Sequence, residues 1–150
     1  MSWFPLLLAI HVTLAVSLLA PSLILPFLLR SDAVGKRPGG VARVLMAMQG
    51  TGSVVIGGGL ALTGAGLVAS LGTALLSEPW LLVALTVYAV NLLAAAFVSR
   101  PNLRRLLRVG ASGDDAAWRK RARRQRYLAY AMAAATGMIG FLMSTKPALW

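Results

Sequence analysis

Apolar residues fall into four long runs along this chain, and polar residues are mostly confined to the segments between them. The runs cover 3–29, 44–71, 80–99 and 127–145. Each is close to or above the 20 or so residues with which a helix crosses a hydrocarbon core of about 30 Å. Because lipid offers the backbone no hydrogen-bond partner, each run is expected to be a helix. The pattern predicts an all-α integral membrane four-helix bundle forming one domain, 1–150.

The composition agrees with this class of protein. The chain is 58% hydrophobic and 13% charged, whereas soluble domains average about a quarter charged residues. The first run is not expected to be a cleaved signal, because no basic residue precedes it and it exceeds the length of a signal core. The absence of cysteine excludes disulfides, thiolate metal sites and cysteine catalysis.

Basic residues are concentrated in two of the three connections, 30–43 and 100–126. The first connection has four basic residues and one acidic residue, the third has ten and two, and the second has only Glu78. Both basic connections fall on one side of a four-span protein, which the positive-inside rule places in the cytoplasm. The sequence therefore predicts a multi-pass protein of the bacterial cytoplasmic (inner) membrane, N-out/C-out. Aromatic residues expected at the two interfaces are Trp3, Trp80 and Trp150 outside and Tyr127 and Tyr130 inside.

Local signals suggest where the third and fourth helices end and begin. The pair Arg100-Pro101 predicts the end of the third helix. The segment Ser112-Gly113-Asp114-Asp115 resembles a capping box, and predicts a helix that runs through the arginine cluster into the fourth span.

The second run carries small residues on one helical face. They recur every four positions, at Ser53, Gly57, Ala61, Ala65 and Ala69. Small residues at this spacing let helix backbones approach closely in a membrane. We expect this face to pack within the bundle; contact with another subunit, a planar cofactor or a lipid tail are the alternatives.

His11, the only histidine, lies inside the first run. Ionisable residues within membrane spans are functional candidates by default. His11 is about 12 Å along the helix from Trp3, and an equal depth in the other spans reaches Thr63, Tyr88 and Met138. This depth supports two hypotheses, which the sequence leaves open. His11 and Met138 could ligate a haem or porphyrin, or His11, Thr63 and Tyr88 could form a hydrogen-bonded cluster.

Several other polar residues fall within the runs, and hydrogen bonds between helices account for them. They are Gln49, Thr51, Thr86, Asn91 and Thr136. No carboxylate lies in any run, which argues against a proton-coupled transporter and against carboxylate catalysis. We find no catalytic constellation, and the sequence leaves open whether the protein is an enzyme.

A dense basic cluster precedes the fourth run. Its members are Arg119, Lys120, Arg121, Arg123, Arg124 and Arg126. A soluble arm of this kind would suggest nucleic-acid binding. Here the cluster is joined directly to a span, so anionic lipid headgroups are the expected partner and nucleic acid is not.

Short motifs near the ends of the spans resemble those of a bacterial family of small predicted integral membrane proteins of unknown function. The motifs are Leu8-Ala9-Ile10-His11, Pro79-Trp80-Leu81-Leu82 and Leu142-Met143-Ser144-Thr145-Lys146-Pro147, together with the basic third connection. That family is distantly similar to membrane-type protoporphyrinogen oxidase and to copper-resistance D-type proteins. The resemblance to the oxidase implies a b-type haem at His11. The chain departs from that pattern in lacking a lysine near the start of the third span, and from copper importers in having a single histidine.

Three functions follow as hypotheses, the third of which is a helper for the permeation of a lipid or small molecule. In the first, the protein binds haem or porphyrin through His11, with Met138 or Tyr88 nearby, for redox or tetrapyrrole metabolism. In the second, it is a non-catalytic accessory subunit of a larger membrane complex or a homo-oligomer, and it has no cofactor.

Overall fold

A computed structural model describes residues 3–30 and 40–148, and within these ranges the chain is helical with no strand. Four stretches are long and apolar enough to cross a membrane. They are Trp3–Phe27, Arg43–Leu71, Pro79–Ser112 and Asp115–Thr145. The prediction of an all-α protein with four candidate spans is confirmed. Most of the first basic connection, 31–39, lies outside the described residues, as does Trp150.

The four spans are built from six α-helices and three shorter helical segments among the described residues. The α-helices are α1 (Trp3–Arg30), α2 (Gly40–Ala47), α3 (Ser53–Leu71), α4 (Pro79–Ala94), α5 (Arg100–Ser112) and α6 (Asp115–Thr145). Two π-helical turns, η1 (Met48–Gly52) and η3 (Ala95–Ser99), join α2 to α3 and α4 to α5. A 3₁₀ segment, η2 (Thr73–Ser77), connects the second and third spans.

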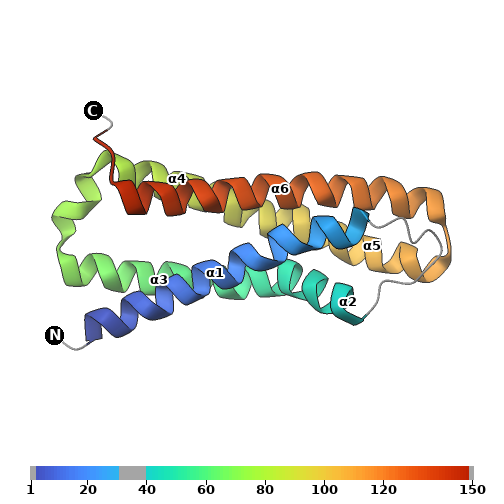
Figure 1. The fold of residues 1–150 in the computed structure, drawn as a ribbon, viewed down its shortest axis with the longest axis horizontal. Helices are drawn as coiled ribbons and strands as arrows, with labels where there is room; N and C mark the ends of the chain where they lie inside the picture. The colour runs from blue at the N-terminus through green and yellow to red at the C-terminus, as the bar shows by residue number, and fades with distance from the viewer. Residues whose placement is uncertain (1–2, 31–39, 149–150) are drawn as a thin grey trace.

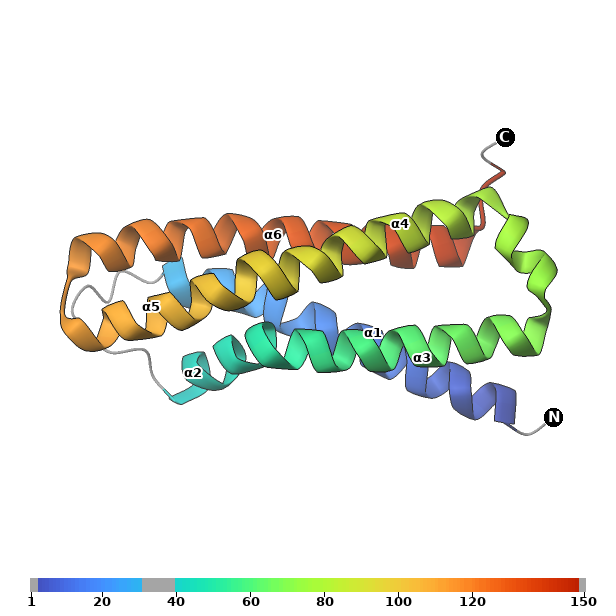
Figure 2. The same cartoon turned by 180° about the vertical axis from the view of Figure 1, so that it is seen from behind.

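The helices lie roughly along one long axis, and the bundle has two distinct ends. α1 begins and α6 ends at the same end, which we call the terminal end (Figure 1). The turn between α5 and α6 lies at the other end, here named the arginine end after the basic residues of 100–126. Seen from behind, α4 and α5 form one continuous path beside α6, and α2 and α3 form another beside α1 (Figure 2).

The predicted end of the third helix at Arg100-Pro101 is wrong. The helix continues through Pro101 to Ser112. The preceding π-turn explains this, because the amide of Arg100 bonds to the carbonyl of Ala95, five residues back. Pro101 therefore stands in the first turn of α5, where a missing N–H is tolerated.

The predicted helix start near Gly113 is confirmed. Gly113 ends α5 in the left-handed conformation, with φ of 79°. Asp114 then caps α6, its carboxylate accepting from the amide of Ala117 at 3.1 Å. From this cap α6 runs without interruption for 31 residues to Thr145.

A hydrophobic cluster joins the four spans at the arginine end. It consists of Leu25, Met46, Leu103, Leu106 and Ala122, all buried. Many large apolar side chains elsewhere are exposed along the spans; Leu62 is 77% exposed and Val55 is 69% exposed. Exposed apolar surface of this kind in every span is what a lipid surrounding accommodates.

Candidate functional site

His11 lies against α3, where it contacts Thr63 and Gly64. Its Nδ1 atom is 2.8 Å from the hydroxyl of Thr63. The imidazole passes over Gly64 so closely that a Cβ there would lie 3.3 Å from His11 Cε1. The predicted proximity of His11 and Thr63 is therefore present.

The hydroxyl of Thr63 also lies within hydrogen-bonding distance of two backbone carbonyls of α3, those of Gly59 at 2.9 Å and Leu60 at 3.1 Å. When its proton is donated to either carbonyl, Thr63 accepts from His11 Nδ1. The lone pair of the imidazole is then on Nε2, the atom that would serve as a metal ligand. In the other tautomer, Nδ1 accepts from Thr63.

Tyr88 is paired with a different part of α3. Its hydroxyl donates to the carbonyl of Gly57, and Gly57 has no side chain to block the approach. Gly57 precedes Thr63 by about 9 Å along the helix. Tyr88 therefore belongs to the α3–α4 contact, and its hydroxyl bonds to Gly57 rather than to His11.

Met138 is located on the outward side of α6. It follows the fully buried Ala129 by about two and a half turns, and its side chain is 53% exposed. The described geometry therefore gives no support to a His11–Met138 pair of axial ligands. Of the residues predicted for haem, His11 alone has a fitting arrangement.

The stripe of small residues on α3 divides into two parts. Ser53 and Gly57 are buried, and Leu92 of α4 packs directly on Gly57. Ala61, Ala65 and Ala69 are exposed. Packing within the bundle thus accounts for the first part of the stripe only.

Other glycines of α3 receive the side chains of α1. A Cβ at Gly66 would lie 2.9 Å from Leu7, and one at Gly59 would lie 3.4 Å from Leu14. Together with the His11 contact, these approaches form the α1–α3 interface near the terminal end. Glycine is needed here for the space that it leaves.

A buried network of amides lies where the two π-turns meet α6. Gln125 donates from Nε2 to Ser99 at 2.9 Å and to Gln49 at 3.4 Å. Its Oε1 accepts from Asn102 at 2.9 Å. Gln49, Ser99 and Gln125 are each 0% exposed, and Asn102 is 5% exposed. This amide network links the second, third and fourth spans.

Some buried polar atoms near this network have no hydrogen-bond partner among the described residues. They are Gln49 Nε2, Arg100 Nε and Asn102 Oδ1. Such atoms are costly when buried, and each calls for a structural or functional explanation. The π-turns beside them are also uncommon features that often occur at functional sites.

The sequence predicted a hydrogen bond between helices for Gln49, but it did not predict the network or the partners of Gln49. Ser99 and Gln125 are next to arginines and Asn102 is two residues from Arg100 and Arg104. All three fall in what the sequence presented as the end of a span and a connection. The available signal was the spacing of polar residues along α5 and α6, and it becomes visible only once α5 is known to be helical.

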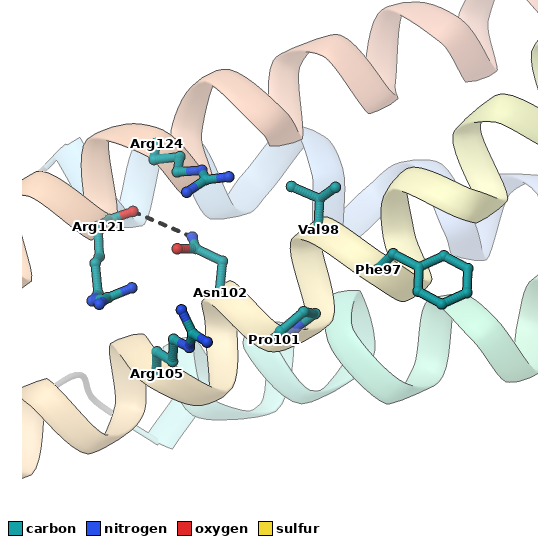
Figure 3. A pocket seen from close by; sticks show the side chains of 7 residues that line it. All are labelled: Phe97, Val98, Pro101, Asn102, Arg105, Arg121 and Arg124. Atoms are coloured by element: carbon teal, nitrogen blue, oxygen red, sulfur yellow. Dashed lines mark hydrogen bonds between the residues drawn. The ribbon is translucent and has the colours of Figure 1, made fainter.

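A shallow groove between α5 and α6 lies beside Asn102, with a volume of about 200 Å³. Its apolar wall is formed by Phe97, Val98 and Pro101, and its polar wall by Asn102, Arg105, Arg121 and Arg124 (Figure 3). Of the six basic residues predicted to meet anionic lipid, only Arg121 and Arg124 line this groove. Arg119, Lys120 and Arg123 are exposed, and Arg126 is half-buried.

The described residues contain no group of three or more histidines, cysteines or carboxylates that could hold a metal ion. No known protein family, curated protein or solved structure matches the chain.

Proposed function

We propose that this protein is a non-catalytic helical subunit that associates with another membrane-spanning helix through the open face of α3. The observation that supports this proposal is the exposed part of the small-residue stripe. Gly58, Ala61, Ala65 and Ala69 are all exposed on one side of α3, and a Cβ at Gly58 would meet nothing within 4 Å. Such a surface lets a second helix approach closely and gain van der Waals contact.

The test compares leucine substitutions on this face of α3 with leucine substitutions on exposed surfaces of α4 and α6. In mild detergent, the native mass of the purified protein should exceed that of one chain, owing to a second copy or a stoichiometric partner. Ala61→Leu with Ala65→Leu should release the associated chain, because the added side chains separate the helices. The control, Ala89→Leu with Ala134→Leu, alters two exposed alanines of α4 and α6 and should retain it. A strictly monomeric wild-type protein would contradict the proposal.

A second candidate function is supported by the contact between His11 and Thr63. A histidine that donates from Nδ1 to a neighbouring oxygen holds its Nε2 in the orientation used by metal ligands. We propose, as this alternative, that His11 ligates the iron of a haem, which would supply redox chemistry. In that case Thr63 positions the imidazole and Gly64 provides the space for it.

An absorption spectrum of the protein after gentle extraction tests the alternative. A haem protein should show a Soret band, which His11→Ala should abolish and Met138→Leu should leave unchanged. Thr63→Val should shift the band or weaken haem retention without removing the ligand. A colourless preparation, followed by no spectral change on adding haemin, would rule this function out.

The orientation in the membrane is likewise proposed from charge. We infer that the arginine end faces the cytoplasm of a bacterial cell and that both chain ends lie outside. A reporter fused after residue 150 that is active only outside the cytoplasm should be active, and the same reporter inserted after Gly113 should be silent. The reverse pattern would overturn this orientation.

A further inference from the structure

The groove between α5 and α6 has the chemistry of a phosphate site at a membrane surface. Three of its seven lining residues are arginines and none is acidic. The arginines come from two helices, and each helix presents a pair of polar residues three positions apart, Asn102 with Arg105 and Arg121 with Arg124. Residues at this spacing lie on one helical face, so both helices direct guanidinium groups toward the same space.

Phosphate is the anion that best fits this arrangement. Arginine binds phosphate oxygens through pairs of parallel N–H donors, and its charge persists at any physiological pH. The volume of about 200 Å³ is several times the roughly 30 Å³ occupied by one water molecule. The groove is therefore large enough for a phosphate group and is open on one side.

The apolar wall distinguishes a lipid phosphate from a free one. Phe97 is 74% exposed and lies about 12 Å along the helix from Arg105, toward the apolar part of the third span. A molecule held by the arginines would therefore extend along Phe97 and Val98 into the hydrocarbon. A phospholipid has this combination of an anionic phosphate and an acyl chain.

Asn102 indicates that the lipid headgroup carries a hydrogen-bond donor. Its Nδ2 donates to Gln125 at 2.9 Å and to the carbonyl of Arg121 at 3.5 Å, while its Oδ1 has no partner among the described residues. In Figure 3 the carboxamide lies among the side chains of Arg105, Arg121 and Arg124. A phosphate oxygen cannot satisfy Oδ1, because both atoms accept hydrogen bonds. Oδ1 is enclosed in the structure, so a hydroxyl group beside the phosphate can satisfy it once the surrounding arginine side chains move slightly aside.

We propose that this groove binds one anionic phospholipid whose phosphodiester carries a hydroxylated headgroup, such as phosphoglycerol. Arg105, Arg121 and Arg124 hold the phosphate, Asn102 Oδ1 accepts from the headgroup hydroxyl, and Phe97 lies along an acyl chain. The site is independent of both functions proposed above, since it uses neither the open face of α3 nor His11.

Native mass spectrometry of the full chain in neutral detergent provides the test. Phosphatidylglycerol, phosphatidylmethanol, phosphatidylcholine and inorganic phosphate are added separately at equal concentrations. We expect one phosphatidylglycerol to be retained per chain. Phosphatidylmethanol has the same charge without the hydroxyls and should bind several-fold more weakly, while phosphatidylcholine and inorganic phosphate should be largely lost.

Two sets of variants separate this site from general attraction to the basic surface. The triple variant R105Q, R121Q and R124Q should weaken phosphatidylglycerol binding by about tenfold or more. The control R104Q, R108Q and R123Q removes the same charge from exposed arginines of the same two helices and should bind within about threefold of wild type. A triple change to lysine at 105, 121 and 124 keeps the charge but loses the paired donors, and should give an intermediate affinity.

Three results would overturn the proposal. They are equal losses of binding in the two glutamine variants, equal binding of phosphatidylglycerol and phosphatidylcholine, and retention of inorganic phosphate without lipid. Equal binding of phosphatidylglycerol and phosphatidylmethanol would overturn the role of Asn102. Circular dichroism of each variant, matching that of the wild type, ensures that these outcomes refer to folded protein.

Discussion

At the terminal end α1 packs on α3 through glycines, whereas at the arginine end three spans meet around a network of buried amides. The first contact depends on the absence of side chains at Gly59, Gly64 and Gly66, and it gains its energy from close approach. The second depends on Gln125, which bonds to partners in two other spans. One small bundle thus uses two ways of joining its helices.

The difference also concerns specificity. A buried amide fits only one register, because a shift of one helix along another leaves its donors and acceptors unpaired. The hydrophobic cluster around Met46 and Leu106 lies at the same end as the amides. We infer that the amide network fixes the register of the second, third and fourth spans.

Loss of the amides should produce the largest effect on stability. Gln125→Met approximately preserves the side-chain volume but removes the hydrogen bonds of Gln125 to Ser99 and to Gln49 Oε1. Asn102 Nδ2 then keeps only its 3.5 Å hydrogen bond to the carbonyl of Arg121. The free energy of unfolding should fall by about 2–3 kcal/mol, since unsatisfied buried groups are costly. Reversible unfolding in mixed detergent micelles measures the change. Leu128→Met, nearly volume-conserving and one turn away, should change it by less than about 1 kcal/mol; equal effects would remove the distinction between the two ends.

Bulk introduced at the glycine contact should have a smaller effect. In Gly64→Leu the new side chain meets the rigid imidazole of His11, whose Cε1 lies 3.3 Å from the Cβ position. Overpacking of this kind should destabilise the protein by about 1–2 kcal/mol and separate His11 from Thr63. Gly140→Leu serves as the control, because a Cβ at that exposed position meets nothing within 4 Å. A neutral Gly64→Leu would show that α1 slides freely on α3.

The smallest expected effect concerns Asn91 and Thr136, a single polar contact between α4 and α6. Asn91 Nδ2 donates to the Thr136 hydroxyl at 3.2 Å. A double-mutant cycle with Asn91→Ala and Thr136→Ala should give a coupling energy of about 0.6 kcal/mol, the average for hydrogen bonds between membrane helices. Coupling above about 2 kcal/mol would show that isolated polar pairs are as important as the network.

The positions of the spans could be predicted from the sequence, but the rotation of each helix could not. Long apolar runs predict how far along its span each residue lies, and this position correctly placed His11 near Thr63. Depth says nothing about the direction of a side chain around the helix axis, so Tyr88 and Met138 were grouped with His11 although the structure directs them elsewhere. Pro101 led to a third helix that was predicted too short. The π-turn that lets the helix continue through Pro101 has no recognised signature in the sequence. Because residues after Pro101 were not predicted to be helical, the sequence could not predict that Asn102 and Arg105 lie on the same helical face.

The length of the third candidate span has a consequence for the surroundings of its arginine end. From Pro79 to Ser112 it comprises 34 residues, roughly 50 Å of helix against about 30 Å of hydrocarbon in a typical bilayer. A span of this length has about 20 Å more than such a bilayer needs, and its last part, α5, packs against α6. If the chain crosses a membrane with Pro79 at one surface, the paired ends of α5 and α6 therefore lie in water beyond the other surface.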